Sequence, residues 1–343
     1  MPAAAAAENW ICDALNAALL DGFDRADAGE APTAWPDCLP EAHRDALRRR
    51  GRLGEAVAGV ITAYAALQPN ERTELREARY DQMRPAELYA GELSAKRVQD
   101  LPAPLAAPLR EYADCVFDAL DDLGVRDRSF EIHGRTQGLA CAFCGYEAAD
   151  NARVRNMDWD HYLAKSLYPF AGANLLNFAP MGDACNRTFK SSKDILRSNA
   201  GARRRCFDPY ASEPATVDLL DSTLFARGPG NLLPEWRIGI RGDADSCATW
   251  DAIFELSARW IDRLDRVHEG CLGKFGRLHR GRALTDADVV DGLDRLASMH
   301  REHETAAGEF LPAAVYELWS VRCAGAGEEA GRLLRLLRRL AEP

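Results

Sequence analysis

The chain has 343 residues, of which 47% are hydrophobic and 28% charged, and its formal net charge is −10 at pH 7. This length allows two or three domains with cores of their own, and the composition is typical of a soluble globular protein. The net negative charge argues against a protein that binds nucleic acid over its whole surface. No apolar run reaches the roughly 20 residues of a membrane helix, and no secretory signal pattern is visible, so we expect a cytoplasmic protein without membrane association.

Residues 1–125 are predicted to form a helical domain. Apolar residues recur at helical spacing from Trp10 to Leu19 and again through 41–67. A third helix is predicted to begin at Pro69, and an amphipathic segment over 104–123 ends at Gly124. No catalytic motif stands out in this region.

Residues 126–210 differ in character, with more Asn, Gly, Cys and aromatic residues. The segment 128–135 alternates like a strand, the segment 138–147 contains a CxxC turn followed by Gly145, and a short helix is predicted around 183–198. From residue 151 to residue 206 there are ten Lys and Arg against four Asp and Glu, a local charge of +6, so the remainder of the chain carries −16. A basic island in an acidic chain favours one site that meets phosphate.

Residues 211–343 are predicted to be mostly helical. Possible strands at 215–226 and 235–242 precede four helices, at 250–278, 286–307, 310–320 and 328–340. The last helix is basic and amphipathic, and packing with exposed Arg is favoured over membrane or calmodulin-like binding. His300 and His303 have the spacing of a metal-binding pair, but no third ligand follows nearby, so we interpret them as surface residues. The predicted fold class is α+β and predominantly helical.

The residues that carry chemistry lie between Met157 and Asp194. Hydrolysis of a phosphodiester bond needs a base to activate water and a divalent cation to neutralise developing charge. Asp160 and His161 place a carboxylate beside an imidazole, which is a natural base near pH 7. A strand end or bend is needed there, because neighbouring side chains of a strand point to opposite sides. Asn177 and Asn186 follow and offer uncharged oxygen ligands.

Three basic residues, Arg187, Lys190 and Lys193, come next at helical spacing and are predicted to contact phosphate. With them, the segment resembles the HNH endonuclease family, the ββα-metal nucleases. The resemblance covers about 60 of the 343 residues, and its motifs stand in the family order. In chain order they are CAFC at 141–144, Asp160-His161, Lys165-Ser166-Leu167-Tyr168-Pro169, Asn177-Phe178-Ala179-Pro180, and Cys185-Asn186 with Lys190.

This resemblance implies a central ββα-metal module over 126–210, flanked by helical regions at 1–125 and 211–343. His161 would be the general base, Asp160 and Asn186 would bind catalytic Mg²⁺ or Mn²⁺, and Asn177 would hold the His161 ring or its loop. Asp158 is expected to lie outside the first coordination shell of the metal while Trp159 packs.

The sequence leaves two readings open for a structural zinc. Many HNH proteins carry a second CxxC pair, but here Gly182 stands where its first Cys is expected. Three thiols remain, Cys141, Cys144 and Cys185, and a tetrahedral zinc site needs a fourth ligand. The candidates for the fourth ligand are Cys206, His133 and Asp183. The alternative is that no zinc is bound and the three cysteines only pack.

The predicted function is that of a metal-dependent endonuclease acting on DNA, with RNA not excluded. Large flanks around a small nuclease resemble prokaryotic defence effectors, which work beside an ATPase or a sensor, so a protein partner and a role in antiphage defence are expected by analogy. The alternative is a non-catalytic zinc-knuckle module that binds nucleic acid or protein.

Overall fold

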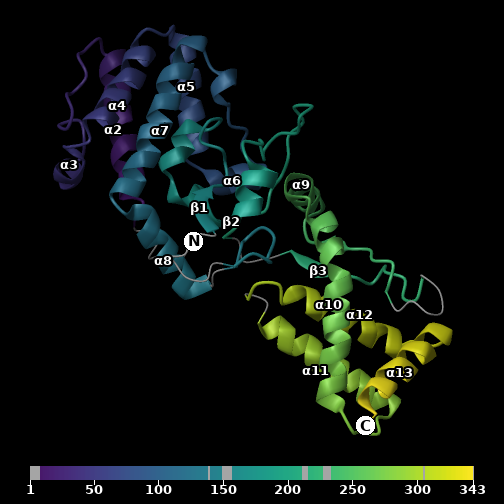
Figure 1. Cartoon of the computed structure of the whole chain (residues 1–343). Helices are drawn as coiled ribbons and strands as arrows, with labels where there is room; N and C mark the ends of the chain where they lie inside the picture. The colour runs from purple at the N-terminus through teal and green to yellow at the C-terminus, as the bar shows by residue number, and fades with distance from the viewer. Residues whose placement is uncertain are drawn as a thin grey trace. The chain divides into compact units, whose positions relative to one another are not determined.

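The computed structural model describes residues 8–137, 140–148, 157–210, 215–226, 233–303 and 306–342. The chain divides into two compact units (Figure 1): unit 1 comprises Met1–Gln137 and Asn151–Ala211, and unit 2 comprises Gly138–Asp150 and Ser212–Pro343. Helices dominate both units and the described strands are short, so the predicted helical α+β class is confirmed. The finer division into ranges 1–125, 126–210 and 211–343 stays a prediction.

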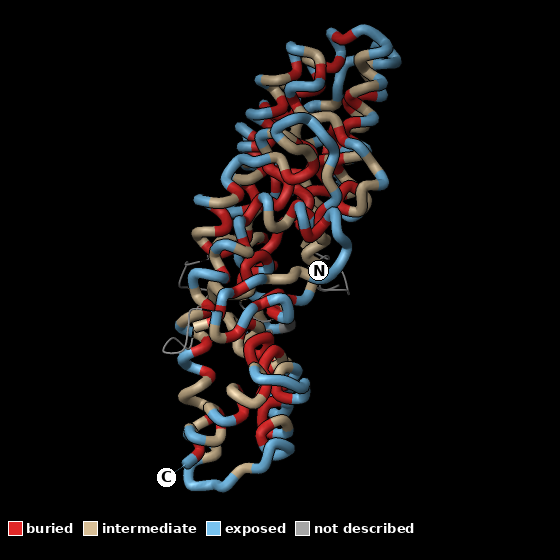
Figure 2. The backbone as a smooth tube through the Cα atoms, turned by 90° about the vertical axis from the view of Figure 1, so that its right-hand side faces the viewer, coloured by how far each residue is buried: buried red, intermediate tan, exposed pale blue. Residues whose placement is uncertain are grey.

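Unit 1 is built on helices from the first part of the chain. They are α2 (Trp10–Asp27), α3 (Glu41–Leu47), α4 (Gly51–Ala65), α5 (Pro69–Gln82), α6 (Pro85–Tyr89), α7 (Ala106–Asp122) and α8 (Val125–Gln137). α4 packs against both α2 and α7, and the buried apolar residues of these three helices include Leu15, Val60 and Leu109. Buried positions are red in Figure 2. Burying each such side chain contributes about 1.5–3 kcal/mol. The predicted periodicity of these helices is therefore confirmed, with the apolar stripe forming the core of the unit.

A small two-stranded layer with short helical turns completes unit 1. Strand β1 (Met157–His161) pairs antiparallel with β2 (Phe178–Gly182), and Asp160 lies opposite Ala179 while His161 lies opposite Phe178. The connection contains two short 3-10 turns, Pro169–Ala173 and Leu175–Asn177, and β2 leads into a π-helical turn, η5 (Ala184–Lys190). His161 is the last residue of β1, which is the strand end that the Asp160–His161 pair requires.

Unit 2 consists of two strands followed by helices. They are β3 (Thr216–Asp218), β4 (Gly239–Arg241), α9 (Ala244–Phe254), α10 (Leu256–His279), α11 (Asp286–Glu302), α12 (Phe310–Ala324) and α13 (Glu328–Ala341). β3 and β4 pair antiparallel, and α12 packs against α10, α11 and α13. α13 buries Leu333, Leu334 and Leu337 and leaves Arg335 and Arg339 exposed, so its apolar face is used for packing as predicted.

The CxxC segment forms the predicted turn within unit 2. The Cys141 N–H donates to the Glu147 carbonyl at 2.7 Å, and the Gly145 N–H donates to the Cys141 carbonyl at 2.9 Å. The Trp260 indole of α10 donates to the Cys144 carbonyl at 3.1 Å. Gly145 has φ +62°, and a Cβ there would lie 2.9 Å from the Phe310 ring, so only glycine fits this turn without strain.

Several predicted elements are wrong in type or extent. The segment 128–135 is not a strand but lies in α8, because Phe130 and His133, three residues apart, share the buried face of a helix. The helix predicted over 250–278 is interrupted at Glu255, whose φ of +54° separates α9 from α10. The strands predicted at 215–226 and 235–242 shrink to β3 and β4. No helix in the described part of the chain has the length and apolar character needed to cross a bilayer.

Candidate active site

His161 is held rigidly at the end of β1. Its side chain is buried, and its ring contacts Phe117 of α7, with a centroid separation of 5.1 Å, and Phe178 of β2, at 4.2 Å. Its Nε2 lies 2.9 Å from the Gly172 carbonyl oxygen. A carbonyl can only accept a hydrogen bond, so Nε2 carries the proton, and in the neutral ring Nδ1 carries the lone pair.

Asp160 lies on the Nδ1 side of that ring. Its Oδ1 accepts the His161 backbone N–H at 2.7 Å and lies 3.2 Å from His161 Nδ1. Burial raises the pKa of Asp160, but the hydrogen bond from the His161 backbone N–H and the charge of Lys190 outweigh it and hold the pKa well below its usual range. Burial lowers the pKa of His161 despite the opposing effect of Asp160. An ionised carboxylate therefore stands beside a neutral imidazole at neutral pH.

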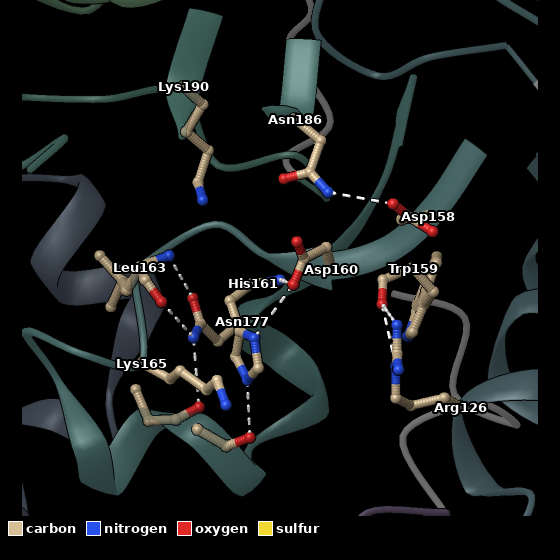
Figure 3. Close-up of polar contacts among 12 residues, drawn as sticks. Arg126, Asp158, Trp159, Asp160, His161, Leu163, Lys165, Asn177, Asn186 and Lys190 are labelled. Atoms are coloured by element: carbon tan, nitrogen blue, oxygen red, sulfur yellow. Dashed lines mark hydrogen bonds and ion pairs between the residues drawn. The ribbon is translucent and has the colours of Figure 1, made fainter. Parts of the chain in front are cut away.

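Asn186, in the first turn of η5, faces the same region. Its Nδ2 donates to Asp158 Oδ2 at 3.2 Å (Figure 3). Among the described residues, neither Asn186 Oδ1 nor Asp160 Oδ2 takes part in a hydrogen bond. Figure 3 shows Asn186 and Lys190 on one side of a common space and Asp160 with His161 on the other. Two uncommitted oxygen atoms, one of them charged, form a donor set that suits a hard divalent cation.

Asn177 contacts the loop after β1 and not the His161 ring. Its Oδ1 accepts the Leu163 N–H at 2.6 Å, and its Nδ2 donates to the carbonyls of Leu163 at 3.1 Å and Ala171 at 3.2 Å. The side chain is buried, with an exposed fraction of 1%. Asn177 was predicted to hold either the His161 ring or its loop, and these contacts are with the loop. The same loop carries Gly172, whose carbonyl accepts the hydrogen bond from His161 Nε2.

Residues of the helical region add further anchors that the sequence analysis missed. Gln82 Oε1 accepts the Phe170 N–H at 2.9 Å, and Asn9 Oδ1 accepts the Leu175 N–H at 2.8 Å. The Tyr89 hydroxyl donates to Asn177 Oδ1 at 3.2 Å. These partners lie far away in the chain, and no local pattern marks them. The region predicted to lack functional motifs thus shapes the site.

The three basic residues do not form one exposed stripe. The Arg187 side chain is 69% exposed and lies 3.4 Å from Asp158 and 3.6 Å from Asp183. Lys190 is buried and directed toward Asp160, and burial lowers its pKa while Asp160 opposes this (Figure 3). Lys193 is exposed but lies beyond η5, since Ser191 with φ 46° ends the helical turn. Of the three, Arg187 and Lys193 are the ones accessible to a phosphate at the surface.

Cys141 and Cys144 lie in unit 2 and Cys185 lies in unit 1, and all three residues are buried. Cys206, one of the predicted fourth ligands of a zinc ion, donates its thiol to the Ile195 carbonyl at 3.1 Å.

Comparisons of the chain with protein-family models, with curated proteins and with solved structures found no match. The resemblance to HNH nucleases therefore depends on the motifs between Cys141 and Asp194 alone.

Proposed function

We propose that the chain is a metal-dependent endonuclease of the HNH type that hydrolyses phosphodiester bonds of DNA. The observation that carries the proposal is the fixed orientation of His161. Because its Nε2 donates to Gly172, its basic Nδ1 faces the side where Asp160 and Asn186 offer uncommitted oxygens. A base and an oxygen donor set in this arrangement are what phosphodiester hydrolysis requires.

In this proposal each residue has a separate task. His161 accepts a proton at Nδ1 from the attacking water, and its ring stays aligned because Phe117, Phe178 and the Gly172 carbonyl restrict it. Asp160 and Asn186 hold Mg²⁺ or Mn²⁺, which when bound neutralises charge that develops on the phosphate and the leaving oxygen. Arg187 and Lys193 bind flanking phosphates from the surface, and Lys190 adds positive charge beside Asp160.

A cleavage assay tests the proposal. The full chain is incubated with supercoiled plasmid or with RNA, in Mg²⁺, Mn²⁺ or EDTA, and His161→Ala is compared with wild type. His303→Ala is the matched control, because His303 is exposed and lies outside the site. We expect wild type and the control to nick plasmid in Mg²⁺ or Mn²⁺, and we expect EDTA or His161→Ala to stop the reaction.

The other outcomes are also informative. Cleavage that survives both EDTA and His161→Ala would contradict the assignment. Cleavage of RNA in place of plasmid would keep the chemistry and change the substrate. The assay is repeated with the products of neighbouring genes, since an ATPase or sensor partner in antiphage defence is part of the proposal. No cleavage in any mixture would favour the non-catalytic binding module.

We further propose that Cys141, Cys144 and Cys185 hold a structural zinc. All three thiols are buried, and thiolates are common ligands of structural zinc. Elemental analysis of the purified chain tests this directly. We expect about one zinc per chain in wild type and in Cys38→Ser, a single cysteine outside these three, and a loss of zinc in Cys141→Ser. Equal zinc contents in all three proteins would remove the proposal.

A further inference from the structure

Asp158 lies beside the proposed metal-binding residues, although the sequence analysis assigned it no role. Asp158 and Asp160 are two positions apart on β1, so their side chains share one face of the strand. Asp158 Oδ2 lies 3.2 Å from Asn186 Nδ2 and 3.4 Å from an Arg187 guanidinium nitrogen. Among the described residues, Arg187 is the one ionisable side chain that forms a hydrogen bond or ion pair with Asp158.

The chemistry of this contact determines which way the Asn186 amide points. An amide has a donating nitrogen at one end and an accepting oxygen at the other, and either end can face a neighbour. An ionised carboxylate only accepts, so the Asn186 atom that faces Asp158 must be the nitrogen. Asn186 Oδ1 is then turned to the opposite side, toward the space in front of Asp160 and Lys190 (Figure 3).

The opposite amide orientation would be unsuitable for a cation. It would direct the Asn186 NH₂ group, with its partial positive charge, toward the same space as Asp160. The Asp158 oxygen that fixes the amide is occupied by donors from Asn186 and Arg187, and in Figure 3 the other Asp158 oxygen is directed away from Asp160. Asp158 is thus placed to orient a ligand and not to be one.

We propose that Asp158 is a positioning residue that locks the Asn186 amide with its oxygen toward the divalent cation. This inference rests on the proposed function, because it assigns Asp158 its role through a metal bound at Asp160 and Asn186. Groups that orient a metal ligand typically contribute 10–100-fold to metal affinity, and we expect an effect of about that size for Asp158.

The test measures Mn²⁺ affinity of the full chain by electron paramagnetic resonance, without any nucleic acid. Asp158→Ala is expected to weaken Mn²⁺ binding about 10–100-fold. Asp158→Asn is expected to retain most of the affinity, because its amide oxygen still accepts from Asn186 Nδ2. Asp183→Ala is the matched control, since it removes a nearby partner of Arg187 without touching Asn186, and its affinity is expected to stay near that of wild type.

A double-substitution cycle then separates positioning from direct ligation. In an Asn186→Ala background, Asp158→Ala is expected to add no more than about a 3-fold loss, because there is no amide left to orient. Equal losses from Asp158→Ala in both backgrounds, or equal losses from Asp158→Asn and Asp158→Ala, would overturn the positioning role. Circular dichroism and thermal unfolding of each variant confirm that the protein measured is folded.

The cycle also distinguishes the inference from the proposed function. If Asn186→Ala and Asp160→Ala weaken Mn²⁺ binding but Asp158→Ala does not, the inference alone fails. If wild type binds no Mn²⁺, or if neither Asn186→Ala nor Asp160→Ala weakens binding, the metal site of the proposed function fails, and the role of Asp158 fails with it.

Discussion

Each unit contains a buried histidine whose Nδ1 lies beside a carboxylate, but the two histidines differ in what binds the other nitrogen. In unit 1, His161 Nδ1 lies 3.2 Å from Asp160 and Nε2 lies 2.9 Å from the Gly172 carbonyl. In unit 2, His300 Nδ1 forms a close hydrogen bond with Glu309, and Nε2 lies 3.0 Å from the Lys274 ammonium nitrogen. The pair of contacts around each ring, and not the carboxylate alone, decides what the histidine can do.

The second partner sets the tautomer in each case. An ammonium group only donates, so His300 Nε2 accepts from Lys274, and Nδ1 then donates to Glu309. Both nitrogens of His300 are used by the fold. In His161 the Nε2–H group donates to the Gly172 carbonyl, and the basic Nδ1 lies beside a carboxylate. In this comparison His161 keeps one basic nitrogen because its Nε2 donates to a carbonyl, whereas both nitrogens of His300 are already used in hydrogen bonds.

The largest expected effect comes from removing each histidine in turn. His161→Ala is expected to reduce plasmid cleavage by about 10²–10⁴-fold, the usual contribution of a general base. His300→Ala is expected to leave the cleavage rate per folded molecule unchanged and to lower stability by about 1–3 kcal/mol, because Lys274 and Glu309 lose their shared partner. Rates come from single-turnover cleavage, and stabilities from urea unfolding. Equal losses of rate in both variants would break the comparison.

A second prediction concerns the loop that supplies the acceptor for His161. Asn177→Ala removes a buried amide and leaves the Leu163 N–H and the carbonyls of Leu163 and Ala171 without that partner. We expect a loss of about 2–4 kcal/mol and a lower cleavage rate at saturating DNA, since Gly172 is no longer held in place. Tyr316→Phe in unit 2 removes one buried hydrogen bond, to the Cys271 carbonyl, and is expected to cost about 1 kcal/mol without changing the rate. An Asn177→Ala variant that cleaves DNA like wild type would show that loop position does not matter.

The smallest effect is a pH dependence from a third buried histidine, His133, which packs on the rings of Trp159 and Tyr210. Burial lowers the pKa of His133 to about 4, below its ordinary value of about 6.5. The unfolded chain therefore binds this proton first. The contribution of neutral, buried His133 to the free energy of unfolding is fully present above pH 6.5. It is lost as the pH falls toward 4, which lowers the free energy of unfolding by at most about 3 kcal/mol.

Urea unfolding at pH 7 and pH 4.5 measures this contribution. Other groups also titrate in this range, so the informative quantity is the difference between wild type and His133→Phe, which keeps a ring but cannot be protonated. We expect the variant to lose less stability on acidification than wild type does. Identical pH slopes would mean that His133 titrates normally in the folded protein.

The local features of the site could be predicted from the sequence, but its long-range supports could not. The CxxC turn and the strand ending at His161 depend on neighbouring residues, and both predictions are confirmed. The anchors from Phe117 and Gln82 could not be predicted, because Gln82 and Phe170 lie 88 positions apart and only the packed fold brings them together.

Other differences have identifiable physical causes. Lys190 was predicted to contact phosphate with Arg187 and Lys193, but it is buried in the π-helical turn, on the side of Asp160. His300 was interpreted as a surface residue and is buried, because Glu309 and Lys274 satisfy both of its nitrogens. That Asp158 lies on the same face as Asp160 could be predicted, since residues two apart on a strand share one face, but its contact with Asn186 could not.

The central claim is that the face formed by β1 and η5 binds a divalent cation next to His161. An anomalous difference map from crystals grown with Mn²⁺ tests it most directly. The account predicts a peak about 2.0–2.3 Å from an oxygen of Asp160 and from Asn186 Oδ1, on the Nδ1 side of His161. A map with no peak at these oxygens, or with Mn²⁺ bound only elsewhere on the chain, would contradict it.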